Sequence, residues 1–263
     1  MKPEMSNPPT FPVAFDIDRR LPRAQQIYAA LREAILDLRL LPGTPISENR
    51  ICQQTVVSRT PVREAIIRLV QEDLITVFPQ QGSFVAPIRL QKVIEGSFVR
   101  ESLETSIIHL ASAFWSDVHT AVAQEIVARQ RACASAGDHR AFFREDENLH
   151  MHFAVVAGVR GVTQVINDAA THVVRVRRLG NPVPGHMDRA IAEHQLVIDN
   201  LRKGDAAQAV ITLRQHLSRV YSTLTELSER FPSYFDGTGG SIQQIPKAVL
   251  EHLTAQEESV AGS

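Results

Sequence analysis

The chain of 263 residues is long enough for two domains with separate cores, and its 44% hydrophobic content without an 18-residue apolar run excludes a membrane-spanning helix. Two cysteines form no disulfide framework, which favours a reducing cytoplasm. The net charge of the chain is −1. From Arg19 to Arg89, ten arginines against six acidic residues give a local charge of +4, which leaves −5 for the rest of the chain. Such an asymmetry is typical of a nucleic-acid-binding module joined to a second domain.

An arm and two helices are predicted at the start of the chain. Residues 1–22 hold five prolines and little periodicity, which predicts a flexible N-terminal arm. Apolar residues then recur at helical spacing over 27–38, and the turn at Pro42-Gly43 ends that helix. Ser47 is placed to cap a short second helix over 48–54.

The next helix carries paired guanidinium groups at its start. Ser58 can cap a helix over 58–72, and Arg59 and Arg63 leave it from one face because they are four residues apart. Such a helix start suits phosphates and the acceptor edge of guanine. We therefore predict a DNA-recognition helix in which Ser58 and Thr60 hold phosphates while the arginines read bases. The alternative for Arg63 is an exposed ion pair with Glu64 or Glu33.

A hairpin follows the recognition helix. The β-prone runs 74–78 and 83–86 are joined by Pro79-Gln80-Gln81-Gly82, in which glycine supplies the backbone angle that a tight turn needs. Three helices and a hairpin within residues 23–88 predict a winged helix-turn-helix domain.

Nearly everything after Pro87 is predicted to be helical. Apolar residues recur at three- and four-residue spacing over 90–115, 118–134, 139–157, 162–179, 187–202 and 205–229. Short loops between these segments predict an all-α antiparallel helical bundle over residues 89–230, so the fold class is mainly α. Residues 231–263 are predicted to be a partly ordered tail, with a loose final helix over 241–263.

Four polar residues of the bundle stand out by their placement. Asp146 and His150 are four residues apart on one predicted helix, so both side chains reach a common point. His194 and His216 each lie mid-helix near the inward face. Imidazole and carboxylate groups on facing helices can bind a divalent ion in a bundle core. Spacing alone leaves a surface ion pair and hydrogen-bonded core histidines as alternatives.

Two groups of residues resemble one family of bacterial transcription regulators. The first group resembles the winged helix of the GntR type: Leu31-Arg32-Glu33-Ala34-Ile35, Pro42-Gly43, Ser47-Glu48, Val57 to Glu64, and Gly82. The second resembles the all-helical FCD effector domain of the FadR subfamily: Arg100 to Glu104, Asp146-x-x-x-His150, Glu193-His194, and Gly204-Asp205 ahead of His216. The resemblance covers residues 23–229.

This resemblance implies a homodimer that binds a short palindromic operator in double-stranded DNA. It also implies a small carboxylate effector, received in the bundle beside a divalent metal ion (Zn, Ni or Mn). The implied DNA contacts are Ser58, Arg59, Thr60, Arg63, the wing-tip Gly82, and Arg50 in place of an arginine that the fatty-acyl-responsive founder of the subfamily has at the position of Asn49. The implied metal ligands are Asp146, His150, His194 and His216.

A carboxylate effector also needs a cationic side chain. Arg100 and Arg175 are the candidates, and the alternative for Arg100 is a surface pair with Glu104. We interpret the chain as a ligand-responsive DNA-binding repressor rather than an enzyme.

Two turns depart from the family pattern. The β-branched run Thr55-Val56-Val57 stands before the recognition helix where the family usually has glycine. Leu38-Arg39-Leu40 stands where a glycine usually follows the first helix.

Two alternatives belong to other functional classes. An all-helical metal-dependent hydrolase with an accessory winged helix would use the same Asp and His ligands, with Glu193 as the one candidate for a general base. An adaptor protein built on a winged helix is the second alternative, since such folds sometimes bind proteins. The arginines at the start of the recognition helix argue against the adaptor.

Overall fold

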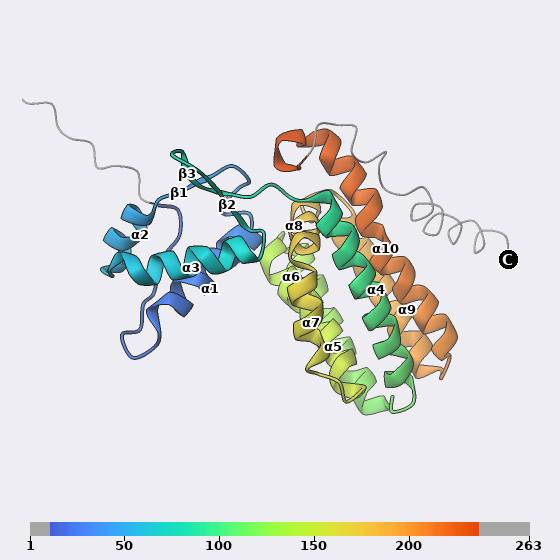
Figure 1. The fold of residues 1–263 in the computed structure, drawn as a ribbon. Coiled ribbons are helices and arrows are strands. Elements are labelled where there is room, and N and C mark those ends of the chain that lie inside the picture. The colour runs from blue at the N-terminus through green and yellow to red at the C-terminus, as the bar shows by residue number, and fades with distance from the viewer. Residues whose placement is uncertain (1–10, 237–263) are drawn as a thin grey trace, which may run out of the picture. The chain divides into compact units, whose positions relative to one another are not determined.

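The computed structural model describes residues 11–236 and divides the chain into two compact units, of which the first ends at Pro87 and the second begins at Ile88 (Figure 1). The first is a winged helix-turn-helix and the second is all helical, so the predicted fold class is confirmed. Every helix among the described residues is too short or too polar to cross a membrane.

Within residues 11–87, which the structure describes, the first unit contains three helices and a small sheet. Its elements are α1 (Arg23–Leu36), β1 (Pro45–Ile46), α2 (Glu48–Thr55), α3 (Arg59–Gln71), β2 (Ile75–Phe78) and β3 (Gly82–Val85). The predicted hairpin is in fact part of an antiparallel three-stranded sheet of order β1-β3-β2, because Pro45 and Ile46 pair with Phe84 and Ser83. The core of the unit buries apolar side chains from α1, α3, the residue before β2, and β3, including Ile27, Leu31, Ile35, Leu69, Leu74 and Val85.

The segment before α1 differs from the prediction. We expected residues 1–22 to form a flexible arm, but the side chains of Phe11 and Val13 are buried. The Gln54 amide of α2 also donates a hydrogen bond of 3.1 Å to the backbone carbonyl of Phe11. Phe11 and Val13 are therefore packed, whereas Leu21 of the same segment is exposed, so the flexible arm stays a prediction apart from these two side chains. Residues 1–10 lie outside the described part of the chain.

The turns that lack the usual glycine adopt left-handed backbone conformations. Val56, which ends α2, has φ 52° and ψ 43°, and Leu38, after α1, has φ 58°. An L-residue in this region places its Cβ too near the following carbonyl oxygen, and a β-branched side chain is least suited to it. The helix-turn-helix geometry is thus kept at the cost of local strain at Val56.

Val56→Gly should stabilise the turn between α2 and α3. Relief of the left-handed conformation is worth about 1–2 kcal/mol. Part of this gain is offset by the greater backbone entropy of glycine in the unfolded chain, about 0.5–1 kcal/mol. We expect amide hydrogen exchange in α2 and α3 of the full-length protein to slow by the equivalent of about 1 kcal/mol.

The matched control for this prediction is Val57→Gly, because Val57 is not among the positive-φ residues. That variant should lose about 0.5–1 kcal/mol of stability. Equal loss of protection in both variants would show that Val56 is not strained.

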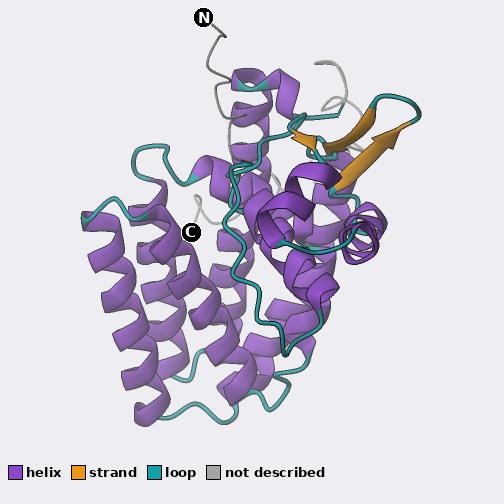
Figure 2. Ribbon diagram, turned by 90° about the vertical axis from the view of Figure 1, so that its left-hand side faces the viewer, coloured by secondary structure: helices purple, strands orange, loops and turns teal. Residues whose placement is uncertain are grey.

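The second unit is a bundle in which long helices run side by side (Figure 2). Its described helices are α4 (Leu90–Ser112), α5 (Asp117–Ser135), α6 (His139–Val156), α7 (Val162–Ala169), α8 (Thr171–Gly180), α9 (His186–Arg202) and α10 (Ala206–Arg230). The main core packs buried side chains from α4, α5, α6, α9 and α10, among them Ile108, Val127, Leu149, Phe153, Val197 and Leu213. Five of the six predicted helical segments are single helices.

The sixth predicted segment, 162–179, is instead broken into α7 and α8. Ala170 stands between them with φ −90° and ψ 12°, and the Thr171 hydroxyl donates to the Asp168 carbonyl (3.0 Å). The break packs closely against Gly96 of α4, where an added Cβ would lie 2.5 Å from the Ala169 carbonyl oxygen. Periodicity could not reveal the break, because the apolar spacing continues across it.

Gly96→Ala should therefore destabilise the bundle, although alanine is the better helix former. The new methyl group meets a backbone oxygen rather than a flexible side chain, so α4 and the α7–α8 junction must move apart, at about 1–3 kcal/mol. Thermal unfolding of the full-length protein measures this loss.

Gly161→Ala serves as the control, because no heavy atom lies within 4 Å of the Cβ that it adds. Its backbone, with φ −64°, accepts alanine. Equal stability of the Gly96 and Gly161 variants would contradict the close packing.

The last described residues contact the start of α4. A short 3₁₀ helix, η1 (Pro232–Tyr234), leads to Phe235, which forms a β-bridge with Ile88. The Asp236 carboxylate then accepts a hydrogen bond from the Leu90 backbone N–H (2.8 Å). Residues 231–236 thus belong to the bundle, and the predicted final helix over 241–263 lies outside the described residues.

Candidate metal centre and DNA-binding surface

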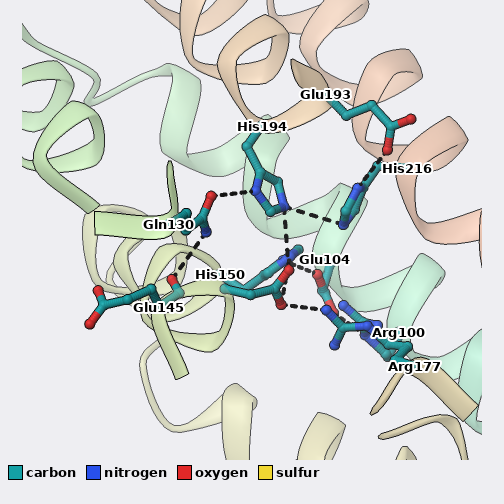
Figure 3. Close-up of polar contacts among 10 residues, drawn as sticks. Arg100, Glu104, Gln130, Glu145, His150, Arg177, Glu193, His194 and His216 are labelled. Atoms are coloured by element: carbon teal, nitrogen blue, oxygen red, sulfur yellow. Dashed lines mark hydrogen bonds and ion pairs between the residues drawn. The ribbon is translucent and has the colours of Figure 1, made fainter. Parts of the chain in front are cut away.

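The structure brings together the four residues that the sequence singled out in the bundle. Asp146 and His150 come from α6, His194 from α9 and His216 from α10 (Figure 3). One ligand atom from each of them lies within 4.8 Å of the corresponding atoms of the others. Asp146 and His194 are 1% and 0% exposed, so the alternative of a surface ion pair does not hold.

Two of the imidazoles are oriented by oxygen atoms that lie behind them. The Nδ1 atom of His194 lies 3.0 Å from the amide oxygen of Gln130, whose nitrogen in turn donates to the Glu145 carbonyl. The Nδ1 atom of His216 lies 2.9 Å from a Glu193 carboxylate oxygen. Because these oxygens are acceptors, Nδ1 carries the proton in both rings and the Nε2 lone pair faces the cluster.

The third imidazole repeats this arrangement. The Nδ1 atom of His150 lies 2.5 Å from a Glu104 carboxylate oxygen as a close contact, and neither ring nitrogen of His150 has a hydrogen-bond partner. The Nε2 atom of His150 is 3.9 Å from Asp146, whose other carboxylate oxygen is 3.6 Å from the Nε2 atom of His194. All three imidazoles therefore turn Nε2 inward.

This donor set fits a divalent cation. The Nε2 atoms of His194 and His216 are 3.3 Å apart, and each carries a lone pair when its Nδ1 is protonated. Two facing lone pairs and a buried carboxylate repel one another, and a bound cation would remove this repulsion. Three imidazoles and one carboxylate suit Zn, Ni or Mn better than they suit Ca or Mg.

The protonation states also match metal binding. Burial would raise the pKa of Asp146, but Arg177 and the three histidines hold that pKa well below its usual range. Burial, together with the charge of His216, lowers the pKa of His194 well below its ordinary value. At neutral pH the carboxylate is therefore charged and the His194 ring is neutral, which are the forms that bind a metal.

Two cavities adjoin the cluster, and two arginines line both. Their volumes are about 240 and 250 Å³, and Arg100, Asp146 and Arg177 contribute to each. Arg177 forms an ion pair with Asp146, and the Arg100 guanidinium donates to Glu104 (2.6 Å). The Arg100–Glu104 pair that we considered as a surface alternative exists, but it is buried beside the cluster.

The second arginine that we predicted for the effector is placed differently. Arg175 is fully buried and lines neither of these two cavities, and burial lowers the pKa of its guanidinium to about 9. Arg177, two residues further along α8, lies at the cluster instead (Figure 3). Sequence reasoning missed Arg177 and Gln130, because their roles depend on how α8 and α5 are rotated. Glu104 could have been suspected, since it is one turn from Arg100.

The residues predicted to contact DNA are on the surface of the first unit. Ser58, Arg59, Thr60, Arg63, Arg50 and Gly82 are all exposed. Ser58 is the N-cap of α3, but its side chain makes no capping hydrogen bond, so the first-turn N–H groups remain open to an anion. Gly82 lies at the end of the β2–β3 turn with φ 111°.

Both recognition arginines make contacts with the first turn of α2. The Arg59 guanidinium donates to the Asn49 side-chain oxygen (3.2 Å). Arg63 forms an exposed ion pair as the alternative expected, but its partner is Glu48 (3.0 Å) instead of Glu64 or Glu33. Such exposed pairs contribute at most about 1 kcal/mol, so both arginines can exchange them for nucleic acid.

The fold and these two sites define a DNA-binding transcriptional regulator with a helical regulatory domain. The chain belongs to the GntR family of bacterial regulatory proteins: residues 23–85 match "Bacterial regulatory proteins, gntR family", and residues 96–219 match "FCD domain". The resemblance predicted from the sequence is confirmed.

Known regulators and a solved structure are similar to this chain. An uncharacterised HTH-type transcriptional regulator in an unstable DNA locus of Streptomyces ambofaciens is 32% identical over 80% of this chain and 89% of that protein. The HTH-type transcriptional repressor RspR of Escherichia coli (strain K12) is 29% identical over 81% of this chain and 94% of that protein. The structure of E. coli McbR/YncC has a TM-score of 0.66 at 19% identity, over 79% of this chain and 99% of that one, and shares the fold.

These families and relatives are transcriptional regulators, not enzymes, which confirms the predicted class and goes against the hydrolase alternative. The geometry agrees, because the candidate base Glu193 contacts Nδ1 of His216, on the side of the ring away from the cluster.

Proposed function

We propose that this protein is a ligand-responsive repressor whose bundle holds a divalent metal ion and a small carboxylate effector. The observation that carries the proposal is the inward convergence of three Nε2 atoms and the Asp146 carboxylate, with an oxygen acceptor behind each imidazole. The name of the E. coli repressor RspR supports the direction of control.

Asp146, His150, His194 and His216 would hold the ion. Bound there, it would supply a positive charge and open coordination positions for an anionic ligand. Glu104, Gln130 and Glu193 orient the three imidazoles through Nδ1, and such outer contacts commonly change metal affinity 10- to 100-fold.

Arg100 and Arg177 would receive the effector carboxylate. Both line the two cavities next to the cluster, and a guanidinium has five N–H donors in a fork that suits a carboxylate. The contact of Arg100 with Glu104 and that of Arg177 with Asp146 each use only some of the N–H donors of the guanidinium group. Arg177 replaces Arg175 in this proposal. The two arginines are therefore Arg100 of α4 and Arg177 of α8.

In the first unit, Arg59 and Arg63 would read base edges while Ser58, Thr60 and the α3 N-terminus hold phosphates. Arg50, at the start of α2, and Gly82, at the wing, would add backbone contacts. One short helix reads few base pairs, so we propose a two-fold homodimer that matches a palindromic operator.

The effector can alter DNA affinity only if it binds one conformation of the protein more tightly than another. Arg100 lies on α4, which begins at Leu90, directly after the junction between the two units at Pro87 and Ile88. A ligand that binds Arg100 would therefore contact the helix that follows the DNA-binding unit in the chain.

The metal site is tested with two variants of the full-length protein. His194→Ala should lose the stoichiometric Zn²⁺ that the wild type retains after dialysis, measured by elemental analysis. Gln130→Met should keep the site but bind Zn²⁺ about 10- to 100-fold more weakly, because the His194 ring loses the acceptor at Nδ1.

His109→Ala provides the control, since this exposed histidine of α4 lies outside the cluster. It should bind Zn²⁺ like the wild type. Full zinc occupancy in folded His194→Ala protein would disprove the site.

The DNA-reading role is tested with an operator selected from a random duplex library. Arg59→Ala and Arg63→Ala should each reduce the preference for the operator over random duplex by roughly 5- to 150-fold, the equivalent of 1–3 kcal/mol for a lost arginine–guanine pair. The binding constants are compared at one fixed salt concentration, because phosphate contacts are salt dependent.

Arg68→Ala removes the same charge from the last turn of α3, where Arg68 lies over the Tyr28 ring. This control should keep the preference for the operator. A preference unchanged in the Arg59 and Arg63 variants would refute base reading by α3.

A further inference from the structure

The arginines of the DNA-binding unit differ in whether a neighbouring side chain contacts their guanidinium group. Those with an acidic or aromatic partner are Arg20 with Asp18, Arg32 with Glu72, Arg39 with Asp37, Arg63 with Glu48, and Arg68 with the Tyr28 ring. Arg19, Arg23 and Arg50 form no ion pair with any residue in the described part of the chain. Arg50 already has a proposed contact with DNA, whereas Arg19 and Arg23 have no assigned role.

Arg19 and Arg23 line one surface cavity of about 410 Å³. The opposite wall comes from the end of α2 and the turn after it, with Gln54 and Val56 among its residues. None of the lining residues is acidic, and Asp16, the nearest carboxylate in the sequence without an arginine partner, does not line it. The cavity is therefore cationic, and no group within it neutralises the two arginines.

The backbone that bears Arg19 is hydrogen-bonded to the first turns of α1. The Gln26 side chain accepts a hydrogen bond from the Asp18 backbone N–H (2.8 Å) and donates to the carbonyls of Asp18 (2.9 Å) and Leu21 (3.1 Å). Arg19 lies between these two residues in the chain, and Arg23 is the first residue of α1. Both guanidinium groups therefore originate beside the start of α1.

The start of α1 lies at the same end of the unit as the start of the recognition helix α3. Tyr28 contacts Arg68, and Arg32, one turn further along α1, contacts Glu72, one turn beyond Arg68. A step of one turn on α1 thus matches a step of one turn along the α3 segment, so the two helices run in the same direction, as Figure 1 shows.

The cavity also adjoins the turn that leads into α3. Val56, which lines it, stands two residues before Ser58, the N-cap of α3. We proposed that Ser58 and the α3 N-terminus hold a phosphate of the operator. In duplex DNA the charges of one strand recur every 3.4 Å along the helix axis. Arg19 and Arg23 are thus placed to meet further phosphates beside the one at α3.

The end of α1 itself favours an anion. Pro22 is at its N-cap position and supplies no side-chain hydrogen bond, and no acidic residue lies in its first turn. The first N–H groups of the helix therefore lack a side-chain cap, and their partial positive charge adds to that of the two arginines.

We infer that Arg19, Arg23 and the start of α1 form a second phosphate-binding surface, which contacts the backbone of the duplex beside the base pairs that α3 reads. This inference rests on the proposed DNA binding and adds a contact that the recognition helix does not make. Because every duplex offers the same phosphates, this surface contributes affinity without sequence preference.

The test measures how DNA binding by the full-length protein depends on salt. Binding constants for the selected operator and for random duplex are determined between about 0.05 and 0.4 M salt, and the slope of log K against log salt is compared. Arg19→Ala and Arg23→Ala should each make the slope shallower by about 0.9 for each subunit that binds. Both duplexes should lose the same affinity, roughly tenfold per subunit at 0.1 M salt, so the preference for the operator stays unchanged.

The control variants separate a phosphate contact from a general effect of charge. Arg39→Ala removes the same charge beyond the other end of α1, where Arg39 pairs with Asp37 and Glu33, and should keep the wild-type slope. Arg19→Lys and Arg23→Lys keep the charge and should also keep the slope. Arg59→Ala should instead reduce the preference for the operator.

The outcomes separate this inference from the proposal beneath it. Slopes of Arg19→Ala and Arg23→Ala equal to that of the wild type overturn the second surface and leave base reading by α3 standing. A slope reduced as much in Arg39→Ala, or a loss of operator preference in place of equal weakening on both duplexes, overturns it as well. If the wild type binds neither duplex at low salt, the inference and the proposed DNA binding both fail.

Discussion

Three oxygen atoms in contact with the Nδ1 atoms of the cluster histidines organise the regulatory domain. Gln130, Glu193 and Glu104 each present an oxygen to the Nδ1 atom of one histidine, and so turn three Nε2 lone pairs toward one point. A histidine without such a partner could rotate or exchange its tautomer, and the convergence would be lost. The acceptors come from α5, α9 and α4, so the site depends on the packing of the whole bundle.

The charges of the site depend on each other in the same way. Asp146 and Glu104 are buried carboxylates, and each faces an arginine as well as a histidine. Removing one member of such a group leaves an uncompensated buried charge, which is far more costly than the loss of an exposed pair. The recognition arginines are the opposite case, because their contacts with α2 are exposed and readily exchanged for another partner. The chain thus keeps fixed charges in the bundle and exchangeable ones on the DNA-binding unit.

Much of the fold was predictable because it rests on local signals. Caps, apolar periodicity and the Pro42-Gly43 turn gave the helices of both units to within a few residues, and the four residues of the cluster were identified before any geometry was known. Errors fell where a distant contact decides the outcome. Phe11 and Val13 are buried although their segment is rich in proline, and the helix expected over 162–179 is broken where it packs against Gly96.

By itself the sequence determined the kinds of groups present and their spacing along each helix: the paired arginines of α3, the four-residue step from Asp146 to His150, and the family to which the chain belongs. Only the tertiary structure decided which arginine of α8 lies beside the cluster and which oxygen contacts the Nδ1 atom of each imidazole. The physical reason is that spacing within a helix is fixed by backbone geometry, whereas the rotation of each helix against its neighbours is set by the packing of all of them together.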